Sequence, residues 1–350
     1  MKPVLFVTGH VAADRLGAFE RLHERAGGIE LALFGGPHLH GSDPLSPPLS
    51  LPHRFVGQRE IGELTASGGY RAVVVGTGGR VALPLAWRAA QRSDLPFVFW
   101  AALWRTPRTA AHLVAQPLMR RIYREATAVV TYGEHVSDYV RRRGATRVFV
   151  APQAVDNAFW SAPAAVREGD RFSLVFAGRA AREKGLAVLV DAWRRAGLNG
   201  IFTVAGDDRR IPPDVVAAGR LDRLQLRNLF AVADVVAVPS LVTRRFIEPW
   251  GLVVNEAMNQ GAAILATDAV GAAAGGLVRD GRNGLIVPAG DPEALADALR
   301  SLAADRARCA ALGAAGREDV AGFTFDAWAE GFAGALEFAV SHAAAGGMPS

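Results

Sequence analysis

One loop of this chain places two cations directly after a buried apolar run. Residues 176–186 read Phe-Ala-Gly-Arg-Ala-Ala-Arg-Glu-Lys-Gly-Leu, which predicts a strand ending at Gly178 and a helix beginning near Gly185. Parallel α/β sheets bind ligands at the carboxyl ends of their strands. There the Arg179 guanidinium can bind two phosphate oxygens at once, and the Lys184 ammonium adds a compact charge. We interpret the loop as a phosphate site, with a solvated loop as the plainer alternative.

Lysine usage singles out Lys184. The chain has 39 basic residues, but its only lysines are Lys2 and Lys184. A surface ion pair at this position could have used arginine, as the chain does elsewhere. A phosphate-binding ammonium is therefore the better explanation.

Two carboxylates eight positions apart form a second candidate site. Pro249 and Gly251 predict a tight turn after Glu248, and residues 252–259 have helical character. Glu256 then lies about one turn inside the helix, so the two carboxylates cannot bind the same atom. Their separation suits a ligand with hydroxyl groups at both ends and a diphosphate between them. Surface charge is the plainer alternative.

The start of that helix also offers backbone donors. The N–H groups of Gly251, Leu252 and Val253 have no partners within the helix. We expect them to point into the site as an anion-binding helix N-terminus.

Together, the two motifs resemble the retaining glycosyltransferases of family 4, which have the GT-B fold. The resemblance covers about residues 170–305 and includes the segments 267–271, 280–284 and 288–291. The combination of Gly-Arg-x4-Lys-Gly with Glu-x7-Glu is specific, whereas either motif alone is weak. The resemblance implies an α/β protein of two Rossmann-like domains that face each other across a cleft.

The resemblance also implies roles for these residues. Arg179 and Lys184 would bind the donor diphosphate and stabilise the leaving nucleotide. Glu248 would face the hydroxyls of the donor sugar, and Glu256 would bind the ribose hydroxyls. The expected catalytic residues are thus Glu248, Arg179 and Lys184. The backbone positions expected at the donor site are Gly9, Gly178, Gly251, Leu252 and Val253.

The first half of the chain departs from the family pattern. The loop at Gly9 lacks the paired glycines that the family often has, and no histidine directly follows the strand near residues 96–99. The nearest, His112, is expected in a helix, so no catalytic histidine is assigned. The loop 76–79 could hold an anion or be an ordinary strand-to-helix turn. The acceptor-side candidates are Trp100, Trp104, Arg105 and Arg108, with core packing favoured for the tryptophans.

Alternating apolar and amphipathic segments predict parallel α/β sheets in both halves. The expected strands lie at 3–7, 29–34, 71–75, 96–99, 128–131, 147–151, 172–177, 201–205, 235–238, 263–266 and 285–287. The expected domains are residues 1–160 on the acceptor side, residues 171–324 around the nucleotide sugar, and a helix at 325–342 that packs back on the N-terminal domain. The segment 156–170 is the expected linker.

Composition favours two soluble domains. The chain has 350 residues, half of them hydrophobic, and a single cysteine, Cys309, which excludes an internal disulfide. No apolar stretch is long enough to span a membrane, and the N-terminal run is too short for a signal peptide. We expect a cytoplasmic protein, with peripheral contact at the inner face of the membrane as an open alternative.

Charge is uneven along the chain. Residues 1–165 carry 19 lysines and arginines against 12 acidic residues, a balance of +7, whereas the remainder carries 20 against 22. Two interpretations explain this uneven charge. The first is a set of solvated arginine-rich helices. The second is an anionic partner, which could be a phosphorylated or lipid-linked acceptor or a membrane surface. Nucleic acid is not expected, since the arginine clusters lack interleaved aromatic residues.

No cofactor and no metal are expected, and the nucleotide sugar would be a co-substrate. Many other glycosyltransferases hold a divalent cation with an Asp-x-Asp triplet, but Asp207 and Asp208 are adjacent. His38 and His40 fit a loop better than a metal site.

Three other functions were weighed. A nicotinamide-dependent oxidoreductase would need a Gly-x-Gly-x-x-Gly run after the first strand, and only Gly9 stands there. A sugar-nucleotide epimerase on the same fold would use similar phosphate contacts without an acceptor. An inactive binding protein is the third, and the two cations and two carboxylates argue against it.

Overall fold

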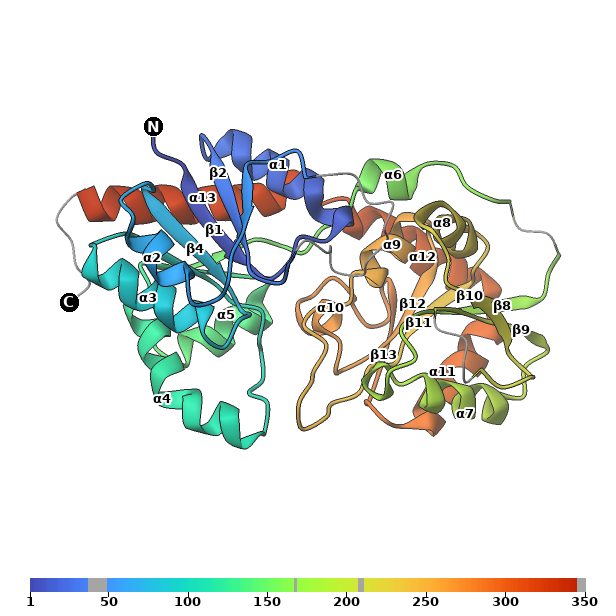
Figure 1. Ribbon diagram of the computed structural model, residues 1–350. Helices are drawn as coiled ribbons and strands as arrows, with labels where there is room; N and C mark the ends of the chain where they lie inside the picture. Colours follow the sequence, from blue (N-terminus) through green and yellow to red (C-terminus); the bar gives the residue numbers. More distant parts are fainter. Residues whose placement is uncertain (37–48, 167–168, 207–210, 345–350) are drawn as a thin grey trace. The chain divides into compact units, whose positions relative to one another are not determined.

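Two parallel sheets, each with its own helices, make up the computed structural model (Figure 1). The structure describes residues 1–36, 49–166, 169–206 and 211–344. The chain divides into two compact units. Unit 1 comprises residues 1–106, 110–156 and 324–350, and unit 2 comprises residues 107–109 and 157–323.

Unit 1 is built on a seven-stranded parallel sheet in the order β3-β2-β1-β4-β5-β6-β7. Its strands are β1 Val4–Thr8, β2 Ile29–Leu33, β3 His53–Phe55, β4 Ala72–Gly76, β5 Phe97–Trp100, β6 Ala128–Thr131 and β7 Val148–Val150. Its helices are η1 Ala13–Arg15, α1 Leu16–Arg25, α2 Ile61–Ala66, α3 Ala82–Arg92, α4 Ala110–Glu125, α5 Glu134–Arg141 and α13 Phe325–Ala344.

The strands of unit 1 are apolar on both faces because helices cover both. Side chains alternate along a strand, so Val4 and Phe6 of β1 pack with α1 and α13, whereas Leu5 and Val7 pack with α3 on the other face. Helix α13, the last of the chain, lies against α1, β6 and β7 and so belongs to this unit.

Unit 2 repeats the arrangement with a six-stranded parallel sheet in the order β10-β9-β8-β11-β12-β13. Its strands are β8 Phe172–Gly178, β9 Gly200–Gly206, β10 Val216–Gly219, β11 Val235–Val238, β12 Ala263–Thr267 and β13 Gly284–Val287. Its helices are α6 Asn157–Ser161, η2 Arg182–Lys184, α7 Leu186–Ala196, α8 Arg223–Ala231, α9 Val253–Asn259, α10 Gly271–Ala274, α11 Pro292–Ala304 and α12 Arg306–Val320.

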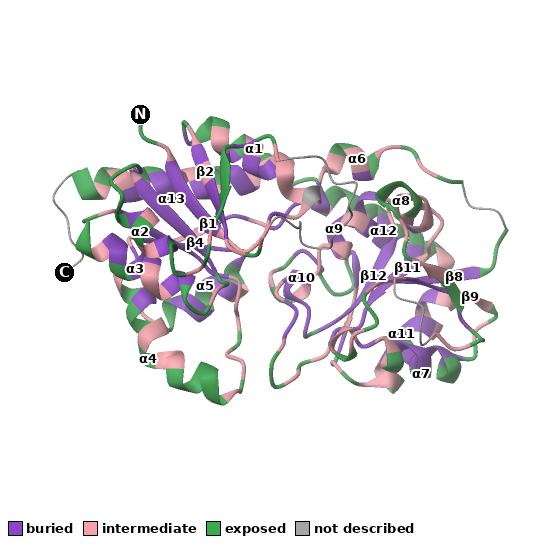
Figure 2. Ribbon diagram, in the orientation of Figure 1, coloured by how far each residue is buried: buried purple, intermediate pink, exposed green. Residues whose placement is uncertain are grey.

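Every predicted strand is present, with ends that differ by a residue or so. The strands β3 and β10 were not predicted. Both are short edge strands without a buried residue, unlike the central strands shown in Figure 2. The sequence of β3, His-Arg-Phe, contains no apolar run, whereas the apolar run Val-Ala-Ala-Gly of β10 was overlooked. The two Rossmann-like units expected from the sequence are therefore confirmed.

The segment expected as a linker is partly ordered onto unit 2. Residues 157–161 form α6, in which Trp160 is buried. The side-chain amide of Gln260 donates to the carbonyls of Trp160 and, at 3.1 Å, of Ala162. The boundary between the two units falls between Asp156 and Asn157, at the start of the expected linker.

A buried carboxylate ties helix α12 to the turn at residues 279–283. Asp319 accepts hydrogen bonds from Arg279 at 2.6 Å and from Arg282 at 2.8 and 2.9 Å. It also accepts one from the side-chain amide of the buried Asn283 at 2.8 Å. Hydrogen bonding from Arg282 and Asn283, with the charge of Arg279, holds the pKa of the Asp319 carboxyl below its usual range.

Candidate nucleotide-sugar site in unit 2

Both sequence motifs lie at the point where the strand order of the second sheet reverses. The chain runs outward from β8 to β9 and β10, then returns to β11 on the other side of β8. In doubly wound sheets, ligands bind beside the carboxyl ends of strands at this point. Arg179 directly follows β8, and Glu248 lies in the loop between β11 and α9.

The loop after β8 is fixed against the end of β11 by a close backbone contact. Gly185 has φ +74°, a conformation that side chains disfavour. A Cβ at this position would lie 1.8 Å from the carbonyl oxygen of Pro239. Leu241 N also donates to the carbonyl of Glu183 at 2.8 Å. Only glycine fits here, and the contact sets where the Lys184 side chain begins.

Lys184 and Glu248 form an ion pair. The Lys184 Nζ lies 2.5 Å from Glu248 Oε2, and the hydroxyl of Ser240 donates to the same oxygen at 3.2 Å. Glu248 is 6% exposed, so this carboxylate depends on its donors to offset the loss of water. Two predicted catalytic residues from different motifs are thus in direct contact.

The turn between Glu248 and α9 is anchored by an indole. Trp250 is buried, and its Nε1 donates to the side-chain oxygen of Asn255 at 2.8 Å. Gly271 N donates to the carbonyl of Glu248 at 3.1 Å, which fixes the start of the turn. Helix α9 begins at Val253, one residue later than predicted, and its first turn carries Glu256.

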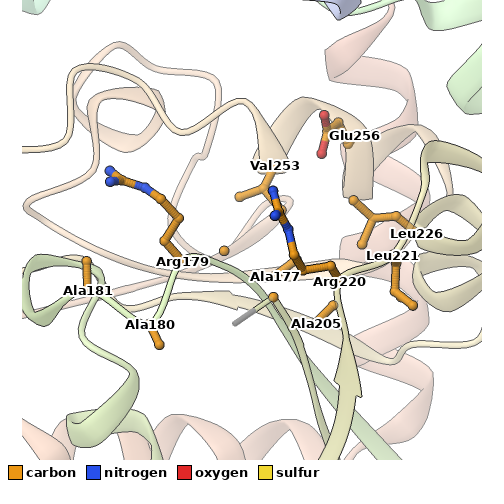
Figure 3. Close-up of a pocket in the computed structure, with 12 residues that line it drawn as sticks. Ala177, Arg179, Ala180, Ala181, Ala205, Arg220, Leu221, Leu226, Val253 and Glu256 are labelled. Atoms are coloured by element: carbon orange, nitrogen blue, oxygen red, sulfur yellow. The ribbon is translucent and has the colours of Figure 1, made fainter. Parts of the chain in front are cut away.

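A cavity of about 920 Å³ opens at the same edge of the sheet (Figure 3). Such a volume falls within the range of ligand pockets. It is lined by Ala177, Gly178, Arg179, Ala180, Ala181, Ala205, Gly206, Arg220, Leu221, Leu226, Val253 and Glu256. Every one of these residues belongs to unit 2.

The floor of the cavity is backbone. Gly178 and Gly206 are neighbours in the register of β8 and β9. Gly206 has φ +145°, and a Cβ there would lie 2.0 Å from the carbonyl oxygen of Gly178. Glycine at position 206 is therefore required by the close approach of the two strand ends that line the cavity.

Two cations and one carboxylate share the cavity. The side chains of Arg179 and Arg220 rise from its floor in Figure 3, and Glu256 lies across from them on α9. Within the described part of the chain, neither arginine has an ion-pair partner, so both are available to an anion. The apolar wall contains Leu221, Leu226 and Val253. The arrangement suits an anionic group near the arginines and hydroxyl groups near Glu256.

The predicted site residues separate into four groups. Gly178, Arg179, Val253 and Glu256 line the cavity, whereas Lys184 pairs with Glu248 beside the same strand ends. Gly251 and Leu252 precede α9, and Leu252 is its N-cap residue. Gly9 lies in unit 1, directly after β1.

Arg220 was missed from the sequence. It directly follows β10, an edge strand that was itself not predicted. The available signal was the pair Gly219-Arg220, which repeats the Gly178-Arg179 pattern of a glycine and an arginine at a strand end.

The acceptor-side candidates in the first half have different surroundings. Trp100 is buried between Phe6, Trp328 and Phe332, so it is a core residue and not an acceptor contact. The ring of Trp104 lies 5.5 Å from that of His135. His112 lies in α4, as expected. Arg105 and Arg108 are both exposed; Arg108 N donates to the carbonyl of Arg244 at 2.7 Å, and the segment 107–109 belongs to unit 2.

Among the described residues, no three His, Cys, Asp or Glu side chains converge as metal ligands. His38, His40, Asp207 and Asp208 lie outside the described residues. No helix in the described ranges is long and apolar enough to cross a bilayer.

Solved structures share this architecture along almost the whole chain. HepE from Anabaena, in complex with UDP and glucose, aligns with a TM-score of 0.75 over 96% of this chain and 100% of that one, at 16% identity. A glycosyltransferase from Rickettsia africae ESF-5 aligns with a TM-score of 0.77 over 97% and 98%, at 14% identity. The protein therefore has the GT-B fold expected from the sequence.

Residues 171–305, the part that contains both motifs, match the family model described as Glycosyl transferases group 1. The chain belongs to this family of glycosyltransferases. A D-inositol 3-phosphate glycosyltransferase of Xylanimonas cellulosilytica is 32% identical over 283 residues, which cover 69% of this chain and 66% of that protein. Membership of family 4 in particular remains a prediction.

A second relative is the GDP-mannose-dependent alpha-(1-6)-phosphatidylinositol monomannoside mannosyltransferase of Mycobacterium tuberculosis. It is 30% identical over 236 residues, 59% of this chain and 60% of that protein. The chain thus spans about two thirds or less of the length of the curated relatives it matches.

Proposed function

We propose that the protein transfers a sugar from a nucleoside-diphosphate sugar to a hydroxyl group of an acceptor, with retention of the anomeric configuration and without a metal ion. The observation that carries the proposal is the cavity in which Arg179, Arg220 and Glu256 meet at the strand ends of unit 2. Family membership supports the same class of reaction.

The two arginines are the proposed binding groups for the diphosphate. Guanidinium groups bind phosphate oxygens in pairs, and Arg179 and Arg220 stand on neighbouring sides of the cavity floor. Glu256 would accept hydrogen bonds from the ribose hydroxyls. Gly178 and Gly206 line the cavity without side chains, and we propose that the phosphates lie against their backbone.

The Lys184–Glu248 pair is the proposed catalytic group beside the reacting bond. Lys184 would supply a preorganised positive charge for the leaving diphosphate, and Glu248 would accept hydrogen bonds from the sugar hydroxyls. Such preorganised charge contributes most when it is aimed at charge that develops in the transition state.

The proposed step needs no nucleophile from the protein. The bond between the anomeric carbon and the phosphate oxygen breaks, and the acceptor oxygen bonds to that carbon on the same face. The acceptor proton moves to the departing phosphate oxygen, which balances the reaction. The cations of the site would lower the energy of the nucleoside diphosphate that leaves.

An acceptor that carries a phosphate is consistent with the relatives. Their names specify inositol 3-phosphate and phosphatidylinositol monomannoside as the molecules acted on. The basic balance of residues 1–165 in this chain would favour such an anionic acceptor.

A panel of nucleotide sugars, with and without candidate acceptors, tests the proposal. We expect slow hydrolysis of one donor in the absence of acceptor, and an α-linked product from an α-linked donor, detected by proton NMR. A new nucleotide sugar with no released sugar would indicate the epimerase instead. If the protein forms no new nucleotide sugar and releases no sugar from any donor, it is an inactive binding protein.

A further inference from the structure

Helix α4 exposes apolar side chains over its first two turns. All five residues from Ala110 to Val114 are exposed (Figure 2). Leu113 is 61% exposed and Val114 is 81% exposed. Leaving two successive large aliphatic side chains in water forgoes the free energy that their burial would contribute. Pro117, which is also exposed, extends this surface by a further turn.

The exposed face of α4 changes character along its length. Leu113, Pro117, Arg120 and Arg124 follow spacings of four, three and four, so they lie along one side of the helix. The N-terminal half of this side is apolar, and the C-terminal half is cationic. The opposite side carries Ile122 and Tyr123, which are buried in unit 1.

Among the described residues of unit 1, those packed against α4 leave this outer face exposed. Leu118 and Met119 pack against the core of the unit and hold the helix in place. In Figure 1, the first turns of α4 lie at the edge of unit 1, away from its sheet. The apolar residues at 113 and 114 are therefore not part of the core that fixes α4.

Further cations lie beside the basic half of α4. A Cβ at Gly144 would lie 3.4 Å from the Cβ of Arg124, so the arginines that follow α5 come close to α4 at this point. Arg120, Arg124 and Arg142 are exposed and form no ion pair with any residue that the structure describes. Arg121, by contrast, pairs with Glu125 at 2.7 Å.

We propose that the outer face of α4 docks onto an anionic phospholipid bilayer. Interfacial helices bury apolar side chains at the boundary between headgroups and acyl chains while cations stay among the lipid phosphates. Leu113 and Val114 would enter the bilayer, and Arg120, Arg124 and Arg142 would meet its negative charge. Each such cation strengthens binding to an anionic surface. This inference is independent of the donor chemistry proposed above.

Vesicle co-sedimentation of the full chain tests this. We expect binding to phosphatidylcholine vesicles that contain phosphatidylglycerol, weak binding to pure phosphatidylcholine, and loss of binding between about 0.05 M and about 0.5 M salt. Removing two cations with Arg120→Gln/Arg124→Gln should weaken binding roughly 25-fold. Leu113→Asn/Val114→Asn should weaken it at least about tenfold.

Matched controls are available in unit 2. Leu224 is 51% exposed on α8, and Arg308 is exposed on α12. Leu224→Asn and Arg308→Gln should bind vesicles like the wild type. Equal binding to both vesicle types, no binding to either, or unaltered binding by both α4 variants would overturn the proposal. A wild-type dimer in light scattering that Leu113→Asn/Val114→Asn converts to a monomer would also overturn it, because a second copy would then cover this face.

Discussion

The ammonium nitrogen of Lys184 lies 2.5 Å from a carboxylate oxygen of Glu248, 64 positions further along the chain. Each residue comes from a different sequence motif, and the backbone contact between Gly185 and Pro239 brings the two loops together. Because Glu248 is nearly buried, we expect the pair to contribute to stability as well as to supply charge to the proposed reaction. This dual role separates Lys184 from the exposed Arg179.

The ion pair should therefore be measurable as coupling in stability. Lys184→Met leaves the Glu248 carboxylate buried without its counter-charge, and we expect a loss of about 2 kcal/mol in the free energy of unfolding. Lys184→Met/Glu248→Gln should recover at least half of that loss. A double-mutant cycle from melting curves gives the coupling energy. Additive losses in the cycle would show that the pair does not contribute to folding.

Arg179→Ala should lower kcat/KM by roughly 10²–10³ without lowering the melting temperature. The reason is that an exposed arginine contributes little to stability but much to a developing negative charge. Arg182→Ala is the matched control, since Arg182 is exposed in the same loop and does not line the cavity. Steady-state kinetics with the preferred donor decide the matter. An equal loss of kcat/KM in the two variants would mean that Arg179 does not bind the donor diphosphate.

The buried strands could be predicted because their signal is local. Continuous apolar runs such as 235–238 and 128–131 gave strand positions that the structure reproduces without a shift. Helices on both faces require such runs. The edge strand β10, Val-Ala-Ala-Gly, is also apolar, but it is short and consists mainly of alanine and glycine, which are weak strand formers, so its local signal is weaker.

The cavity was only partly predictable for a related reason. Arg179 and Glu256 belong to motifs with defined spacing, whereas Arg220 enters the cavity because β10 pairs with β9. Strand pairing is a tertiary property that spacing along the chain does not encode. Trp100 illustrates the converse case. It follows a strand like a ligand-binding residue, but packing with Phe6 and Trp328 places it in the core.

Activity should survive excess EDTA, because we assign the neutralisation of the leaving diphosphate to side-chain cations and not to a divalent ion. The measurement is the rate of nucleoside diphosphate release before and after dialysis against the chelator. Loss of activity that Mg²⁺ or Mn²⁺ restores would contradict the assignment.

Because of Asp319, the free energy of unfolding of unit 2 should depend on pH. Its pKa is lowered in the folded state, mainly by Arg282. The stability it contributes is therefore fully present above a pH of about 4, where the unfolded carboxyl is ionised, and is lost as the pH falls through the folded pKa. Asp319→Asn should lower the free energy of unfolding by about 2 kcal/mol at neutral pH.

The gap between Asp319→Asn and the wild type should start to narrow as the pH falls below about 4, and it should close as the pH falls through the folded pKa of Asp319. Melting temperatures across this range measure it. Glu318→Gln serves as a control, since Glu318 is an exposed carboxylate on the same helix that forms no ion pair with any described residue, and it should leave the melting temperature unchanged at neutral pH. A constant gap for Asp319→Asn at every pH would show that its charge is not what stabilises the turn at residues 279–283.

Calorimetric titration of the full chain with UDP, GDP and ADP tests the donor site most directly. We predict that one of them binds with a stoichiometry of one. Glu256→Ala should weaken that binding roughly 10- to 100-fold, because a charged hydrogen bond to the ligand is lost, and Arg220→Ala should weaken it as well. Glu318→Ala, an exposed carboxylate on α12, should leave it unchanged. Failure of all three nucleotides to bind, or equal affinity in the wild type, Glu256→Ala and Arg220→Ala, would contradict the assignment of this cavity to the nucleotide sugar.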